Sequence, residues 1–175
     1  RLAGAHAVFR DHPRPPAAFL AGAGGDLFHD LAVHDIDFVR WAVRGAPGGA
    51  DDEIVEVFAT EQAVAEDMRA LGVPDCGAAM LRFRSGFTMT LELSRSSNYG
   101  YDQRVELFGL NGAARVANPP SSALELTSGA WSDGLGGSLS APLYRSFPER
   151  FAAAFEAEVG RFAGIVAGWR AGERE

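Results

Sequence analysis

The sequence contains no lysine, because all 16 basic side chains among its 175 residues are arginines. Any chemistry that needs an amine must therefore come from elsewhere. A single cysteine, Cys76, excludes an internal disulfide and a cysteine metal cluster, and it fits a reducing compartment. No apolar run approaches the roughly 20 residues needed to cross a bilayer, and the N-terminus lacks a signal-peptide pattern. We therefore expect a cytoplasmic protein with no membrane partner.

Basic charge is also scarce. Acidic side chains number 23, the formal net charge is -7, and the arginines are scattered rather than clustered. This distribution excludes the basic footprint of a nucleic-acid-binding protein. With 47% hydrophobic residues the chain has enough apolar sequence for one globular domain. It starts at Arg1 without a methionine, so we expect a fragment of a longer gene product.

The order of patterns along the chain predicts helices at both ends of a run of strands. Apolar residues at helical spacing predict a helix over 26–44, and the prolines before it, in "RDHPRPPAAFLA", predict a loop. Alternating sequence follows, with one hairpin turning at "SG" in "AAMLRFRSGFTMTLEL" and another at "NG" in "FGLNGAARV". A Gly- and Ser-rich loop, "DGLGGSLSAP", precedes an amphipathic helix over 147–169.

These elements predict an α+β fold, in which a large, mostly antiparallel sheet carries helices on one face. We expect one domain spanning 1–175, without internal repeats. Two long helices are few for so large a sheet, so one face is expected to stay uncovered. In "FTMTLEL" apolar residues alternate with threonine and glutamate. The mixed face suits a contact between subunits, and we expect a homo-oligomer.

The stretch "GGDLFHDLAVHDID", residues 24–37, concentrates ionisable side chains at the start of the first helix. Asp30 and His34 are four residues apart and share a helix face, where a carboxylate can hold an imidazole and raise its basicity. Such a pair is suited to proton transfer near neutral pH. The same spacing also fits a first-turn acid favoured by the helix dipole and a half-buried structural histidine.

A metal site is a further possibility, since His29, Asp30, His34 and Asp35 are all ligand types. At about 100° per residue, however, His29 points about 140° away from His34. Only Asp30 and His34 share a face, and no third ligand is evident. We expect no metal.

Two further clusters contain polar groups near strand ends. In "SSNYGYDQR", Tyr99 and Tyr101 are two positions apart, so on an extended chain they point the same way and can line one pocket or cap a sheet edge. The apolar stretch "LAGAHAVF" predicts a first strand, and Asp11 in "RDHP" follows it. A G-x-G-x-x-G fingerprint and a P-loop are both absent from the sequence, so no nucleotide site is predicted.

Three of these stretches, "RDHPRPP", "GGDLFHDLAVHDIDFVRWAV" and "SRSSNYGYDQRVELFG", resemble the C-terminal domain of the Gfo/Idh/MocA oxidoreductase family, and within it the inositol dehydrogenase-like branch. The resemblance covers nearly the whole chain and ends in "RFAAAFEAEVGRF". It implies a partner N-terminal Rossmann domain that binds NAD or NADP and supplies the catalytic lysine. The fragment alone is therefore expected to be inactive.

The resemblance also implies roles for individual residues in oxidising a CH–OH group of a cyclic polyol or sugar. His34 would be the general base that takes the hydroxyl proton while hydride leaves for the nicotinamide. Asp30 would hold His34 and contact the polyol, Tyr99 and Tyr101 would line the ring pocket, and Asp11 would hydrogen-bond hydroxyls.

Two other hypotheses come from different classes. The chain can be a non-catalytic binding or assembly module of the same fold, whose assembly would not depend on Asp30 or His34. It can also be a metal-dependent hydrolase or lyase that uses the His and Asp cluster. Asp26 and His29 stand where the family usually has small or apolar residues, and either can alter substrate preference.

Overall fold

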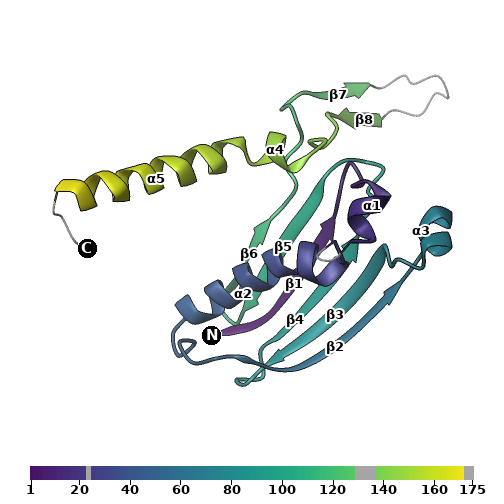
Figure 1. The fold of residues 1–175 in the computed structure, drawn as a ribbon. Helices are drawn as coiled ribbons and strands as arrows, with labels where there is room; N and C mark the ends of the chain where they lie inside the picture. The colour runs from purple at the N-terminus through teal and green to yellow at the C-terminus, as the bar shows by residue number, and fades with distance from the viewer. Residues whose placement is uncertain (23–24, 129–136, 172–175) are drawn as a thin grey trace.

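The chain folds into a curved sheet crossed on one face by a helix, with a second long helix extending from it (Figure 1). This computed structural model describes residues 1–22, 25–128 and 137–171. In chain order the elements are β1 (Leu2–Arg10), α1 (Ala17–Leu20), the π-helix η1 (Leu27–Ala32), α2 (Val33–Gly45), β2 (Ile54–Gln62), α3 (Glu66–Leu71), β3 (Cys76–Phe83), β4 (Thr88–Ser94), β5 (Asp102–Gly109), β6 (Gly112–Val116), β7 (Glu125–Ser128), β8 (Gly137–Ser140), α4 (Phe147–Arg150) and α5 (Ala152–Ala171).

Six strands form the main sheet in the order β2-β3-β4-β1-β5-β6, and β7 pairs with β8 separately. All neighbours are antiparallel except β1 and β4, which run parallel. The two predicted hairpins are β3–β4 and β5–β6. Gly86 in the first turn has φ +87°, a conformation that glycine adopts without strain. The predicted α+β class with a mostly antiparallel sheet is confirmed.

The core lies between the sheet and the helix formed by η1 and α2. On β4 the alternation runs as predicted, with Met89, Leu91 and Leu93 buried and Thr90 exposed. From the helix, Leu27, Leu31, Ala32, Val39 and Val43 are buried in the same cluster. One amphipathic helix thus covers the inner face of the central strands.

The predicted helix over 26–44 forms, but its first six residues are π-helical. Asp26 is its N-cap, and its carboxylate accepts hydrogen bonds from the backbone N–H of Phe28 (2.8 Å) and His29 (2.9 Å). The His29 ring is paired with Asp26 as well, at 2.6 Å. The ionisable residues at the start of this stretch therefore have a structural task, which is to begin the helix.

Some local predictions were wrong. The proline-rich segment that we expected to be irregular contains the short helix α1, whose first turn follows Pro16. Helix α3 was not predicted, and β8 occupies part of the expected loop 133–142, of which 133–136 lie outside the described residues. Each of these elements is six residues or shorter, too brief to show a periodic pattern.

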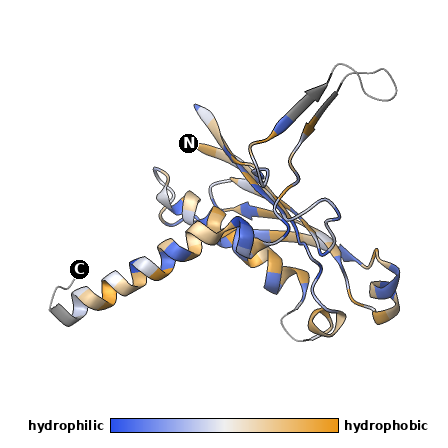
Figure 2. Cartoon of the chain, turned by 90° about the horizontal axis from the view of Figure 1, so that it is seen from above, coloured by the Kyte–Doolittle hydropathy of each residue, from blue (hydrophilic) through white to orange (hydrophobic). Residues whose placement is uncertain are grey.

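Helix α5 covers less of the sheet than its sequence suggested. Two views show it as a rod that leaves the sheet after its first turns (Figures 1 and 2). Its later apolar residues Val159, Phe162 and Trp169 are exposed, whereas Phe151, just before the helix, packs against the core.

In the described part of the chain, no helix covers the outer face of the sheet (Figure 1). Phe58, Met80, Thr90 and His6 are cross-strand neighbours in one row over β2, β3, β4 and β1. Phe58 is 68% and Met80 50% exposed. The prediction of an uncovered face is therefore correct.

Candidate functional site

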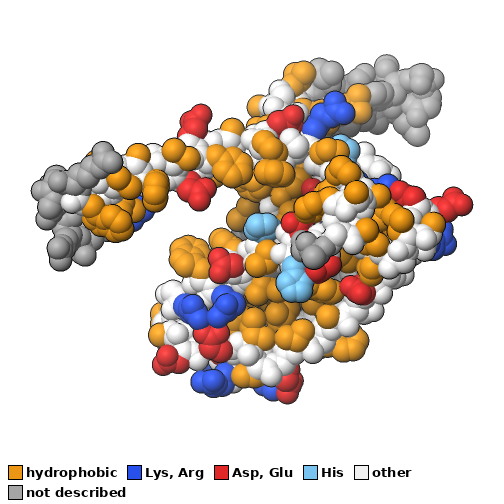
Figure 3. Space-filling view, in the orientation of Figure 1, with side chains coloured by type: hydrophobic (Ala, Val, Ile, Leu, Met, Phe, Trp, Pro, Cys, Tyr) orange, Lys and Arg blue, Asp and Glu red, His pale blue; other side chains and the backbone are white. Residues whose placement is uncertain are grey.

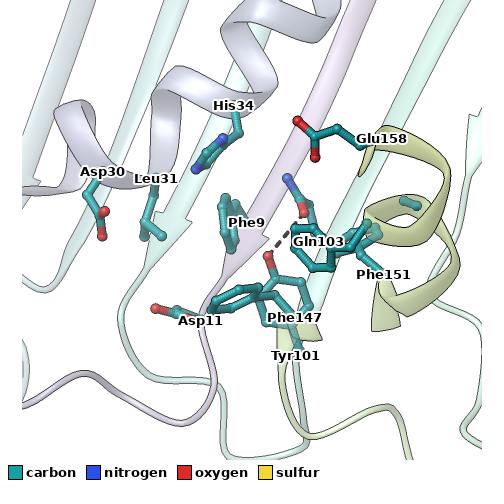
Figure 4. A pocket seen from close by; sticks show the side chains of 12 residues that line it. Phe9, Asp11, Asp30, Leu31, His34, Tyr101, Gln103, Phe147, Phe151 and Glu158 are labelled. Carbon is teal, nitrogen blue, oxygen red and sulfur yellow. Dashed lines mark hydrogen bonds between the residues drawn. The ribbon is translucent and has the colours of Figure 1, made fainter. Parts of the chain in front are cut away.

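A cavity of about 500 Å³ lies where the first turns of the helix pass over the ends of the central strands, beside α4 and the start of α5 (Figure 4). The parallel pairing of β1 with β4 brings their C-terminal ends to one edge, where antiparallel β5 begins, so Arg10 aligns with Ser94 and with Asp102. Loops that are distant in sequence therefore meet at this edge.

The wall of the cavity combines aromatic rings with polar groups. The rings are Phe9, Tyr101, Phe147, Phe151 and Phe155, and the polar side chains are Asp11, Asp30, His34, Gln103 and Glu158. In the space-filling view, hydrophobic side chains gather where the start of α5 comes over the sheet (Figure 3). An apolar wall with a few convergent polar groups is the usual form of a small-molecule site.

His34 lies in the first turn of α2 at the rim of the cavity and is exposed. Its ring centroid is 6.2 Å from that of Phe9. Within the described part of the chain, its imidazole forms no hydrogen bond or ion pair. Both ring nitrogens are thus available to a ligand, as a general base requires.

Asp30 lines the same cavity, but it does not hold His34. Its Oδ2 accepts a hydrogen bond of 2.6 Å from Nη1 of Arg95, and among the described residues no bond joins Asp30 to His34. A charged guanidinium is a stronger donor to a carboxylate than a neutral imidazole is. The predicted pairing of Asp30 with His34 is therefore not confirmed, although both residues reach one cavity.

Asp11 follows β1 and lies on the cavity wall. Its Oδ2 is 3.6 Å from Nη1 of Arg95. Burial raises the pKa of the Asp11 carboxyl, and the charge of Arg95 opposes this shift. The Arg95 guanidinium thus lies against two carboxylates of the site, those of Asp11 and Asp30.

The structure separates the two predicted tyrosines. Tyr101 is buried, lines the cavity, and its ring meets Phe9 edge-on at 5.5 Å. Tyr99 is 51% exposed and outside the cavity, and its hydroxyl donates to Asp102 (2.5 Å) and accepts from Arg10 (2.7 Å). The turn at Gly100, with φ +121°, ends the extended geometry that would have aligned them.

Behind the cavity, a chain of hydrogen bonds leads from Tyr101 to a buried acid. The Tyr101 hydroxyl donates to Oε1 of Gln103 (3.1 Å), and Nε2 of Gln103 donates to Oδ1 of Asp35 (3.2 Å). Burial raises the pKa of Asp35 to about 7, against the opposing hydrogen bond from Gln103 and the charge of Arg150. Burial also raises the pKa of Tyr101.

Several residues of the site were not identified from the sequence. Gln103 and Arg95 lie inside the motif "SRSSNYGYDQRVELFG", but a single glutamine at the start of a strand, or a single arginine after one, has no distinguishing pattern. Phe147, Phe151 and Phe155 fall within the predicted amphipathic helix over 147–169, whose spacing does not indicate what its apolar side chains contact. Only the tertiary fold shows that they face a cavity.

No group of three or more His, Cys, Asp or Glu side chains in the described ranges is arranged to hold a metal ion. His29, one of the candidate ligands, is paired with Asp26 instead. Within the same ranges, no helix combines the length and the apolar character that crossing a membrane requires.

Residues 1–115 match the model of the GFO/IDH/MocA C-terminal domain. The chain belongs to this family. As a GFO/IDH/MocA domain it is similar to myo-inositol 2-dehydrogenase of Thermotoga maritima, with 34% identity over 119 residues, which are 67% of this chain and 33% of that protein.

Solved structures agree with this membership. A myo-inositol dehydrogenase from Corynebacterium glutamicum superposes with a TM-score of 0.79 at 28% identity, covering 100% of this chain and 48% of its own. A scyllo-inositol dehydrogenase from Lactobacillus casei, solved with bound NAD(H) and scyllo-inositol, gives 0.78 at 25% identity and covers 95% and 47%. The chain spans less than half the length of each of these relatives.

Proposed function

We propose that this GFO/IDH/MocA domain is the substrate-binding part of an NAD(P)-dependent dehydrogenase that oxidises a CH–OH group of a cyclic polyol, of the inositol type, or of a sugar. The observation that carries the proposal is the free imidazole of His34 beside the carboxylate of Asp30 on one aromatic-walled cavity. Relatives of this chain that are named inositol dehydrogenases support the substrate class.

In this proposal His34 takes the proton from the reacting hydroxyl, which is far too weak an acid to lose it unaided at neutral pH. Asp30 and Asp11 accept hydrogen bonds from neighbouring hydroxyls, and the rings of Phe9 and Tyr101 pack against the C–H face of the polyol. Since no arginine among the described residues lines the cavity, its carboxylates disfavour phosphorylated or carboxylated substrates.

The nicotinamide, when bound, supplies the hydride acceptor. No phosphate-binding glycine fingerprint occurs in the sequence, and no cationic side chain lines the cavity. We therefore propose that an N-terminal Rossmann domain outside this chain holds the dinucleotide and provides the catalytic lysine, which this chain lacks. The chain alone is expected not to turn over.

The test is NADH formation by the longer gene product that contains this chain, supplied with NAD and a panel of inositols and sugars. His34→Gln should lower kcat by about 100- to 10,000-fold without changing NAD affinity, because the general base is lost. His29→Gln is the matched control, since His29 lies on the same helix but outside the cavity.

Three results would contradict the proposal. A gene product that neither binds NAD nor oxidises any polyol would exclude the dehydrogenase function. Equal turnover by His34→Gln and the unchanged protein would show that His34 is structural. Activity that depends on an added divalent metal would instead favour the hydrolase or lyase class.

We also propose that a second copy of the chain packs on the outer face of the sheet, since Phe58 and Met80 expose apolar surface there without a covering helix. A cytoplasmic location is part of the same proposal, because the reaction would draw on the NAD pool and Cys76 is unpaired.

A further inference from the structure

Arg95 is the most completely buried charged side chain near the cavity, and nothing in the proposed chemistry uses it so far. It follows β4 directly, and its side chain is 1% exposed. A guanidinium removed from water needs charged or hydrogen-bonding partners, because burial of an unpaired charge is strongly unfavourable. The identity of those partners therefore indicates what Arg95 does.

The described partners of the Arg95 side chain belong either to the cavity wall or to the N-terminal end of the helix formed by η1 and α2. Nη1 donates to Oδ2 of Asp30 at 2.6 Å and lies 3.6 Å from Oδ2 of Asp11. Nη2 donates to the carbonyl oxygens of Gly25 (2.5 Å) and Asp26 (3.1 Å). One planar side chain thus joins the end of β4, an acid after β1 and the N-terminal end of η1.

The backbone around Arg95 holds this arrangement in place. The N–H of Asp11 donates to the carbonyl of Ser94 (2.8 Å), and the N–H of Ser97 donates to the carbonyl of Asp11 (3.0 Å). The loop after β4 is thereby fastened to the loop after β1. The Arg95 side chain lies behind the cavity wall, where it contacts Asp11 and Asp30, and it does not line the cavity itself.

We propose that Arg95 is a positioning residue for polyol oxidation, which fixes the Asp30 carboxylate toward the cavity and holds the Asp11 carboxylate beside it. This inference rests on the proposed function and adds to it a residue that does not touch the substrate. The fork of the guanidinium matters, since one end orients the carboxylate while the other anchors the helix start.

The test compares Arg95→Gln and Arg95→Lys in the same NAD-linked assay, with Arg115→Gln as the control. Arg115 pairs with Glu106 on the exposed surface of β6 and β5. In Arg95→Gln we expect kcat to fall by about 10- to 100-fold, with a smaller change in KM, because a misplaced carboxylate lowers the fraction of productive complexes. Arg115→Gln should match the unchanged protein.

The pH profile separates positioning from a merely structural role. The charged or titratable groups facing Asp11 are Arg95, Asp30, Tyr101, His34 and Glu158. In Arg95→Gln the acidic limb of kcat/KM should move to higher pH, because Arg95 opposes the upward shift of the Asp11 pKa. Arg95→Lys should keep that limb but still lose about tenfold in kcat, since a lysine keeps the charge without the fork.

The outcomes distinguish this inference from the proposed function. Suppose that the unchanged protein is active and His34→Gln is inactive. If both Arg95 variants then keep kcat within twofold and show an unshifted pH profile, the Arg95 inference alone is wrong. If Arg95→Gln fails to fold, Arg95→Lys decides, and a kcat equal to that of the unchanged protein overturns the inference. An inactive unchanged protein overturns the proposed function, and the inference that rests on it.

Discussion

At the scale of single residues, Asp35 is an acid held where its charge is unfavourable. Its side chain is fully buried, Oδ2 has no hydrogen-bond partner among the described residues, and burial raises its pKa from the ordinary 3.8 to about 7. Between these two values the folded chain binds one more proton than the unfolded chain. The free energy of unfolding therefore falls as pH rises through this window, by about 2 to 4 kcal/mol from this group.

Asp35→Asn removes that titration, because an amide stays neutral at every pH. We expect the variant to be more stable than the unchanged chain by about 2 kcal/mol near pH 8 and similar to it near pH 4. Urea unfolding at both pH values measures the difference. Parallel stability curves for the two proteins would show that Asp35 is ionised in the folded chain throughout.

At the scale of elements, the start of η1 depends on one cap. Asp26 satisfies two backbone N–H groups there. Asp26→Ala should lower the free energy of unfolding by about 1 kcal/mol, and Asp26→Asn should restore most of it, because asparagine caps helices as well as aspartate does. Asp37→Ala, on an exposed position of α2, is the control in thermal unfolding. Equal losses in Asp26→Ala and Asp37→Ala would contradict the capping role.

The elements also show what the sequence could predict. The helix through His34 and the hairpins at Gly86 and Gly112 follow from periodicity and turn residues, which are local signals. The cavity depends on contacts between distant segments, and so the partner of Asp30 could not be predicted. Asp30 and His34, at i,i+4 spacing, line one cavity, but Arg95, 65 positions from Asp30, binds the Asp30 carboxylate.

At the scale of the whole molecule, we propose that copies of the chain assemble through the outer face of the sheet. We expect a dimer or larger assembly, and Phe58→Glu should shift it toward the monomer, because a charge at the centre of an apolar contact is costly to bury. Light scattering after gel filtration measures the mass. Leu110→Glu, an equally exposed change in the β5–β6 turn, is the control. A monomeric unchanged protein would exclude this interface.

The single parallel pairing in the sheet also bears on how the chain folds. His6 on β1 pairs with Thr90 on β4, 84 positions later, and β5 lies still further along the chain. Closing so long a loop costs conformational entropy before any contact repays it, whereas the two hairpins close short loops. The cavity stands at the end of this long-range pairing, so its acids and imidazole converge only after the centre of the sheet has formed. Before that pairing forms, the chain therefore holds no assembled cavity.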